Sequence, residues 1–198
     1  MRAIIPCAGF GTRMGMKPNE SKEMLFLNNE DTPCIDYALK QCAANGLSPL
    51  VVTRPEKKDL IAYCEELGVK LMLLNPKREW ADTVLASRPY WDEDNVLLLP
   101  DTRWENPRSV HKIVETNCFT IGTHFVMDPQ NWGIYEGGAI IEKPKETHSN
   151  IAWGIIKFEY AEGIKFFTEI ADNKYSLLPK NHTQFNLGRF QDLTRVRL

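Results

Sequence analysis

The chain has 198 residues, enough for one large domain or two small ones, and its 43% hydrophobic content allows a substantial buried core. The net charge of −2 predicts no nucleic-acid partner, because such partners need a broad basic surface. Apolar runs such as Val96–Leu99 are too short to span a membrane, and the first residues show no signal-peptide pattern. The five scattered cysteines are typical of reduced thiols in the cytoplasm.

Strand and helix patterns alternate through the first part of the chain. The strand patterns cover Ala3–Pro6, Leu50–Thr53, Lys70–Leu74, Val96–Leu99 and Phe119–Met127, and the helix patterns cover Cys34–Asn45, Glu56–Leu67, Thr83–Trp91 and Pro107–Thr116. This alternation predicts βαβ units, which build a Rossmann-like, mostly parallel central sheet with helices on both faces. Ligands of such sheets bind at the carboxyl ends of the strands.

The pattern changes after about residue 128. Asn131–Ile141 and Ile151–Tyr160 are expected to form short strands with aromatic residues, and Gly163–Ala171 a short helix. We find no internal repeat and no flexible linker in the sequence. We therefore expect one α/β domain with a larger lobe over about 1–128 and a smaller lobe over about 129–198.

The most informative segment directly follows the first strand pattern. It reads Ala8-Gly9-Phe10-Gly11-Thr12-Arg13, and Lys22 comes nine residues after Arg13. The two glycines let backbone N–H groups approach an anion closely, Arg13 can pair with two oxygens at once, and Lys22 adds a movable charge. The segment therefore predicts a polyphosphate site. A dinucleotide-binding loop is the weaker alternative, because Met14 stands where that fingerprint has its third glycine.

This segment resembles the signature of the nucleotidyltransferases that make sugar nucleotides, in which Gly-x-Gly-Thr-Arg-Met or -Leu is followed by a Pro-Lys or Ser-Lys pair. Here Ser21 stands where most members have Pro. The resemblance implies the nucleotide-diphospho-sugar transferase fold, with a small sugar-binding lobe. It implies nucleotide binding by Ala8, Gly9, Gly11, Thr12 and Arg13, with Arg13 and Lys22 as the catalytic cations. The alternative is a plain glycine turn with two solvated cations.

A carboxylate follows the apolar strand pattern Val96–Leu99, at Asp101. A carboxylate at a strand end can hold Mg²⁺, which neutralises phosphate oxygens, although Pro-Asp-Thr is also a common turn. The resemblance implies that Asp101 and Asp192 bind Mg²⁺ as the cofactor. Pro100 replaces the glycine that the family has before the first aspartate, and the family's glycine after the second is missing. A solvated tail residue is therefore the alternative for Asp192.

A second resemblance lies in Gly137-Gly138-Ala139-Ile140-Ile141-Glu142-Lys143-Pro144, followed by the Ser149-Asn150 pair. It implies that Gly138 admits a pyranose ring, that Glu142 accepts hydrogen bonds from sugar hydroxyls and that Lys143 neutralises the sugar phosphate. The alternative is an exposed turn, because Glu-Lys-Pro is common. Thr83 falls where family members have a Gly-Thr-Ala segment near the base and sugar, with Asp82 in place of the glycine, so the resemblance makes Thr83 a possible nucleotide contact.

Together these motifs are similar to those of an enzyme that joins a nucleoside triphosphate and a sugar 1-phosphate into a nucleotide sugar and pyrophosphate. Two alternatives stay open. One is a cytidylyltransferase acting on a non-sugar phosphate, such as alditol or choline phosphate. The other is a non-catalytic module that senses nucleotides or sugar phosphates.

Overall fold

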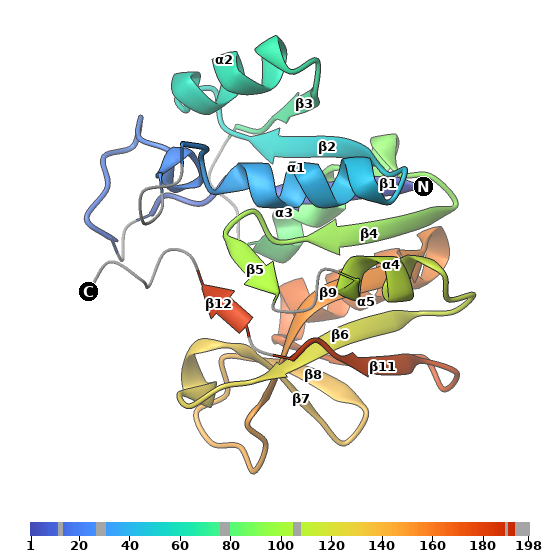
Figure 1. Ribbon diagram of the computed structural model, residues 1–198. Helices are drawn as coiled ribbons and strands as arrows, with labels where there is room; N and C mark the ends of the chain where they lie inside the picture. The colour runs from blue at the N-terminus through green and yellow to red at the C-terminus, as the bar shows by residue number, and fades with distance from the viewer. Residues whose placement is uncertain (12–13, 27–30, 76–79, 105–107, 189, 193–198) are drawn as a thin grey trace.

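A computed structural model of the chain describes residues 1–11, 14–26, 31–75, 80–104 and 108–188, together with the backbone of 190–192 (Figure 1). The strands are β1 (Arg2–Pro6), β2 (Ser48–Thr53), β3 (Lys70–Leu73), β4 (Asp94–Leu98), β5 (Thr102–Trp104), β6 (Thr120–Phe125), β7 (Gly133–Glu136), β8 (Ala139–Glu142), β9 (Ile151–Glu159), β10 (Tyr175–Leu177), β11 (Thr183–Asn186) and β12 (Phe190–Asp192). The α-helices are α1 (Ile35–Ala44), α2 (Lys58–Glu66), α3 (Trp80–Ala86), α4 (Ser109–Val114) and α5 (Tyr160–Asn173).

Ten of the described strands form one mixed sheet, in which the main path runs β10-β8-β7-β9-β4-β1-β2-β3. The strands β4, β1, β2 and β3 are parallel to one another, with Ile4 of β1 opposite Leu50 and Leu97. Strand β9 runs antiparallel to both β4 and β6. The α/β fold class is confirmed. Parallel pairing dominates the first part of the chain, and antiparallel pairing dominates the second.

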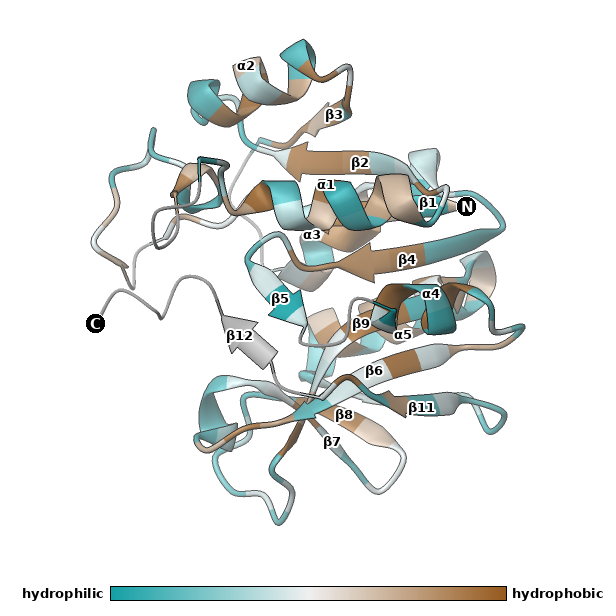
Figure 2. Ribbon diagram, viewed as in Figure 1, coloured by the Kyte–Doolittle hydropathy of each residue, from teal (hydrophilic) through white to brown (hydrophobic). Residues whose placement is uncertain are grey.

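Helices cover both faces of this sheet, because the strands alternate their apolar side chains between two cores. On β1, Ala3 and Ile5 pack in one core with residues of α1, α2 and α4, whereas Ile4 packs in the other with residues of α3 and α5. Figure 1 shows α1 and α4 in front of the sheet and α3 and α5 behind it. The strands β2 and β4 are mostly hydrophobic along their length (Figure 2), as expected for strands covered on both sides.

The predicted elements of the first part are confirmed, with shifted ends. The helix expected over Thr83–Trp91 begins at Trp80 and ends at Ala86. A 3-10 turn follows at Arg88–Tyr90, because Pro89 disfavours helical backbone in the residue before it. In the second part, the helix expected over Gly163–Ala171 extends over Tyr160–Asn173.

The segment expected as one short strand over Asn131–Ile141 is instead a hairpin of β7 and β8. Gly137 and Gly138 connect the two strands with φ angles of 58° and 80°. Two successive positive φ angles are typical of a tight type I′ turn, and glycine adopts them without strain. The adjacent glycines were the signal for this turn.

The described helices include none that is long and apolar enough to cross a membrane. The cysteines are free thiols, and Cys7, Cys34, Cys42 and Cys64 are buried.

Candidate active site

The carboxyl ends of β1, β2 and β4 lie at one edge of the sheet, because these strands are parallel neighbours. The segment that follows β1 and the residues that follow β4 both lie at this edge, on the left in Figure 1. The segment that carries the glycine loop and Lys22 therefore meets Asp101 in space. Lys22 and Asp101 are 79 positions apart in the sequence.

The structure brings two predicted site residues into direct contact. The Lys22 ammonium donates a hydrogen bond to the Asp101 carboxylate. Their side chains are 23% and 15% exposed, so the pair is reached by solvent from one side. A cation suited to phosphate and a carboxylate suited to a metal ion thus form one ion pair beneath the glycine loop.

The described part of the glycine loop has a conformation that depends on its glycines. Gly11 has a φ of 64°, and a Cβ there would lie 3.0 Å from the Met16 sulfur. The Gly11 carbonyl accepts hydrogen bonds from the backbone N–H groups of Met14 and Met16, at 2.9 and 3.4 Å. Among the residues that the structure describes, none except the chain neighbours of Gly9 lies within 4 Å of a Cβ built on this glycine, so they leave the space beside its backbone open to an approaching anion.

The other nucleotide positions have different surroundings. Ala8 is buried in the core beneath the loop, and Thr83 is buried within α3 with 2% of its surface exposed. Thr12 and Arg13 lie outside the described residues. Nucleotide binding at these positions, and phosphate binding by Arg13, stay predictions.

Glu142, at the end of β8, lies close to the ring of Trp153. A Cβ built on Gly133 would lie 2.7 Å from Glu142 Oε2 and 2.0 Å from Trp153 Nε1, so both groups occupy the space above this glycine. The Trp153 ring packs against Trp80 at a centroid distance of 4.9 Å. Trp80 begins α3, and Trp153 shares a core with Ala8 of the glycine loop. The carboxylate therefore lies next to Trp153, which packs against Trp80 and belongs to the same core as Ala8.

Three other residues of this motif, Gly138, Lys143 and Ser149, form contacts or backbone conformations within the second lobe. Lys143 has a φ of 48° and a side chain that is 46% exposed, with its ammonium 3.8 Å from Glu142 Oε1. Gly138 forms the hairpin turn and accepts a hydrogen bond from the Leu178 N–H at 2.9 Å. Ser149 Oγ donates to the Tyr135 carbonyl at 2.7 Å, which ties the loop before β9 to β7. Sugar-phosphate binding by Gly138, Glu142 and Lys143 stays a prediction.

The second predicted metal residue comes close to the first through strand pairing. Strand β12 runs antiparallel to β5, and Asp192 is opposite Thr102, the residue after Asp101. The backbone positions of Asp101 and Asp192 are therefore neighbours, although 91 residues separate them in the sequence. Within the described residues, no group of three or more histidine, cysteine and acidic side chains is arranged to hold a metal ion.

Solved structures of known proteins share this arrangement along almost the whole chain. A protein from Bacillus anthracis assigned as a glucose-1-phosphate thymidylyltransferase, solved in complex with sucrose, superimposes with a TM-score of 0.74 at 19% identity, covering 98% of this chain and 90% of that one. A UDP-glucose pyrophosphorylase from Acinetobacter baumannii superimposes with a TM-score of 0.70 at 19% identity, covering 98% and 88%. The chain has the nucleotidyltransferase fold.

A sequence comparison gives a shorter match. A UTP–glucose-1-phosphate uridylyltransferase of Haemophilus influenzae is 35% identical over 79 residues, which are 39% of this chain. The match spans 26% of that relative's length. No protein-family model matches the chain.

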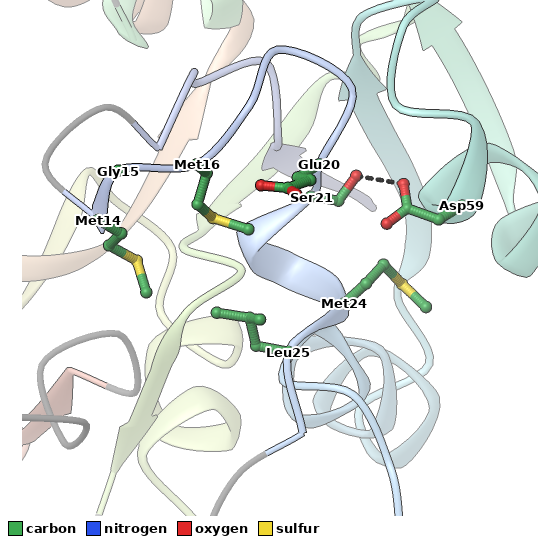
Figure 3. Close-up of a pocket in the computed structure, with 8 residues that line it drawn as sticks. All are labelled: Met14, Gly15, Met16, Glu20, Ser21, Met24, Leu25 and Asp59. Carbon is green, nitrogen blue, oxygen red and sulfur yellow. Dashed lines mark hydrogen bonds between the residues drawn. The ribbon is translucent and has the colours of Figure 1, made fainter.

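In this nucleotidyltransferase fold, a cavity of about 420 Å³ lies on the outer side of the segment that carries Lys22. It is lined by Met14, Gly15, Met16, Glu20, Ser21, Met24, Leu25 and Asp59 (Figure 3). Ser21 Oγ donates to Asp59 Oδ1 at 2.5 Å, which joins the segment to α2. The lining residues that the structure describes combine thioethers with two carboxylates and include no cation.

The sequence interpretation missed two buried cations at this edge of the nucleotidyltransferase fold, Arg54 and Lys57. Arg54 follows β2 directly and Lys57 precedes α2, and both contact the glycine loop or its flanks. Their position just after an apolar strand, at the edge where the loop was expected, is the signal that could have identified them.

Proposed function

We propose that the chain transfers a nucleoside monophosphate from a nucleoside triphosphate to a sugar 1-phosphate and releases pyrophosphate. The observation that carries this proposal is the Lys22–Asp101 contact at the carboxyl edge of the sheet, beneath the glycine loop. A triphosphate binds where positive charges neutralise it and where its oxygens can come close to the backbone. This edge offers the Lys22 cation, the Asp101 carboxylate for a metal ion and the space beside Gly9. The fold shared with nucleotidyltransferases supports the same activity.

The reaction is a single displacement at the α-phosphorus. An oxygen of the acceptor phosphate forms a bond to the α-phosphorus, and the bond from that phosphorus to the bridging oxygen breaks, so pyrophosphate leaves with the electron pair. Such chemistry depends on alignment and charge neutralisation rather than on covalent participation of the protein. Lys22 would exchange its contact with Asp101 for a phosphate oxygen, and Arg13 would pair with the departing phosphates.

We expect Asp101 and Asp192 to hold a Mg²⁺ ion. The β5–β12 pairing, which puts the backbone of Asp192 opposite Thr102, supports this expectation, and Mg²⁺ takes few protein carboxylates. When bound, the ion would neutralise phosphate oxygens of the triphosphate. Asp101 can serve this purpose because its carboxylate is partly exposed and is paired with a flexible lysine rather than with a rigid backbone donor.

The second lobe, about 129–198, would bind the acceptor, and the first, about 1–128, the nucleotide. Glu142 would accept hydroxyl hydrogen bonds, and the partly exposed ring of Trp80, which packs against the buried Trp153, would offer an apolar surface to a sugar ring. Lys143, with its half-exposed side chain, would reach the acceptor phosphate. Free thiols suit a reducing compartment such as the cytoplasm.

The test is pyrophosphate release with Mg²⁺ from UTP, dTTP or CTP, each combined with sugar 1-phosphates and with alditol and choline phosphates. Release that requires a sugar 1-phosphate supports the proposal. Release with a non-sugar phosphate indicates a cytidylyltransferase, and ligand binding without any release indicates a sensing module. Asp101→Asn should abolish release, whereas Asp94→Asn, at the opposite end of β4, should not.

A further inference from the structure

Lys57 contacts both ends of the glycine loop. The loop leaves β1 at Cys7 and ends in the 3-10 turn Lys22–Met24. Lys57, the residue before α2, donates a hydrogen bond to the Cys7 carbonyl at 2.7 Å and another to Glu23 Oε2 at 2.7 Å. Through these two bonds, one side chain joins the start of the loop to its end.

The Lys57–Glu23 pair is fully buried, so each charge depends on the other. Both side chains are 0% exposed. Burial raises the pKa of Glu23 above its ordinary value, and the ammonium of Lys57 opposes that rise. Glu23 Oε1 has no hydrogen-bond partner among the described residues, and Lys57 contributes most to offsetting the burial of this carboxylate, ahead of the charge of Lys22 and the backbone N–H of Glu23. A buried charge that loses such a partner is strongly destabilised.

A second buried cation holds the middle of the same loop. The Arg54 guanidinium lies 3.7 Å from the centre of the Phe10 ring, and it donates to the Pro18 carbonyl at 3.1 Å. The two cations follow β2 and approach the loop from the sheet. These two side chains therefore hold the loop from the side of β2, and among the described residues none except its chain neighbours lies within 4 Å of a Cβ built on Gly9.

We propose that Lys57 is a positioning residue: by joining the Cys7 carbonyl to the Glu23 carboxylate, it holds both ends of the glycine loop and keeps Lys22, the neighbour of Glu23, directed at Asp101. Its effect on ligand binding rests on the proposed function. Its effect on the loop does not, because the contacts exist whatever the loop binds.

The matched control is Lys157, another buried lysine. It is 3% exposed and donates to carbonyls at the end of α4, those of Val114 at 3.3 Å and of Thr116. Lys157→Met therefore removes a comparable buried cation on β9, away from the loop. A purely structural role for Lys57 predicts that Lys57→Met and Lys157→Met behave alike at equal stability.

The experiment compares the two variants with the wild-type protein by hydrogen–deuterium exchange of peptides covering 7–25 and by titration of UTP with Mg²⁺. Lys57→Met should speed loop exchange and weaken UTP binding by about tenfold or more, the factor expected for one charged hydrogen bond. Lys157→Met should leave both within about twofold. Equal changes in the two variants would overturn the proposal.

A double variant, Lys57→Met with Glu23→Leu, keeps the test decisive if Lys57→Met alone does not fold. Removing both buried charges should recover most of the stability, because apolar replacements of a buried pair are often tolerated. Loop exchange should stay fast, since the bond to the Cys7 carbonyl is still missing. Wild-type loop protection in the double variant would refute the proposed role. If the wild-type protein binds no UTP and releases no pyrophosphate, the proposed function fails, while loop exchange still tests Lys57.

Discussion

Replacing Asp101 with asparagine should separate catalysis from stability. The Lys22 and Asp101 side chains are 23% and 15% exposed, so the pair is partly solvated. Partly solvated ion pairs contribute about 1 kcal/mol or less, and a loss of that size lowers the melting temperature of a domain this long by about 2–4 °C. The role proposed at the transferring phosphates predicts a fall in turnover of about 10²–10³-fold.

The assay follows pyrophosphate release under saturating substrates, with thermal unfolding measured on the same samples. Asp94→Asn is the control, because this residue begins the same strand at its other end. An Asp101→Asn variant that keeps wild-type turnover would refute the site. A melting temperature lowered by about 10 °C or more would show that the pair stabilises the fold, and the reasoning from exposure would then be wrong.

Three further predictions concern other parts of the molecule. Gly133→Ala, whose Cβ would lie 2.0 Å from Trp153 Nε1, should displace Glu142 and weaken sugar 1-phosphate binding by calorimetry while sparing nucleotide binding. Burial lowers the pKa of His124 from 6.5 to about 4, so the fold should lose up to about 3 kcal/mol as the pH falls from 6.5 to 4, and His124→Phe should flatten this dependence in urea unfolding. Arg13→Ala should lower turnover by about 10²-fold with an unchanged circular dichroism spectrum.

Several features were predictable from local sequence because local chemistry determines them. The helix at Ile35–Ala44 follows from the spacing of Ile35, Ala38 and Cys42, which are buried on one face. Strand β4 follows from its continuous apolar run, and the parallel neighbours then bring Asp101 to the edge where the glycine loop lies. The parallel order of β1 and β4 therefore predicts that the segment with Lys22 and the residue Asp101 lie at the same edge of the sheet.

Other features depend on contacts between distant residues and have no local signal. The β5–β12 pair is three residues long on each side, too short for a recognisable alternation. The bond from Lys57 to Glu23 joins positions 34 apart, so the position of Lys57 after β2 indicates the edge of the sheet at which it lies but not the carboxylate that it pairs with. Gly154 is another case. A Cβ there would lie 2.1 Å from the Trp104 ring, so its identity depends on a side chain 50 residues away.

The most direct test of the central claim uses a nucleoside triphosphate labelled at its α-phosphate. The protein is incubated with labelled UTP, dTTP or CTP, a sugar 1-phosphate and Mg²⁺, and the products are separated. The proposed function predicts that the label moves into a nucleotide sugar while unlabelled pyrophosphate is released, and that Asp101→Asn prevents both. Label recovered only in the triphosphate or in the nucleoside monophosphate would contradict nucleotidyl transfer to the sugar phosphate.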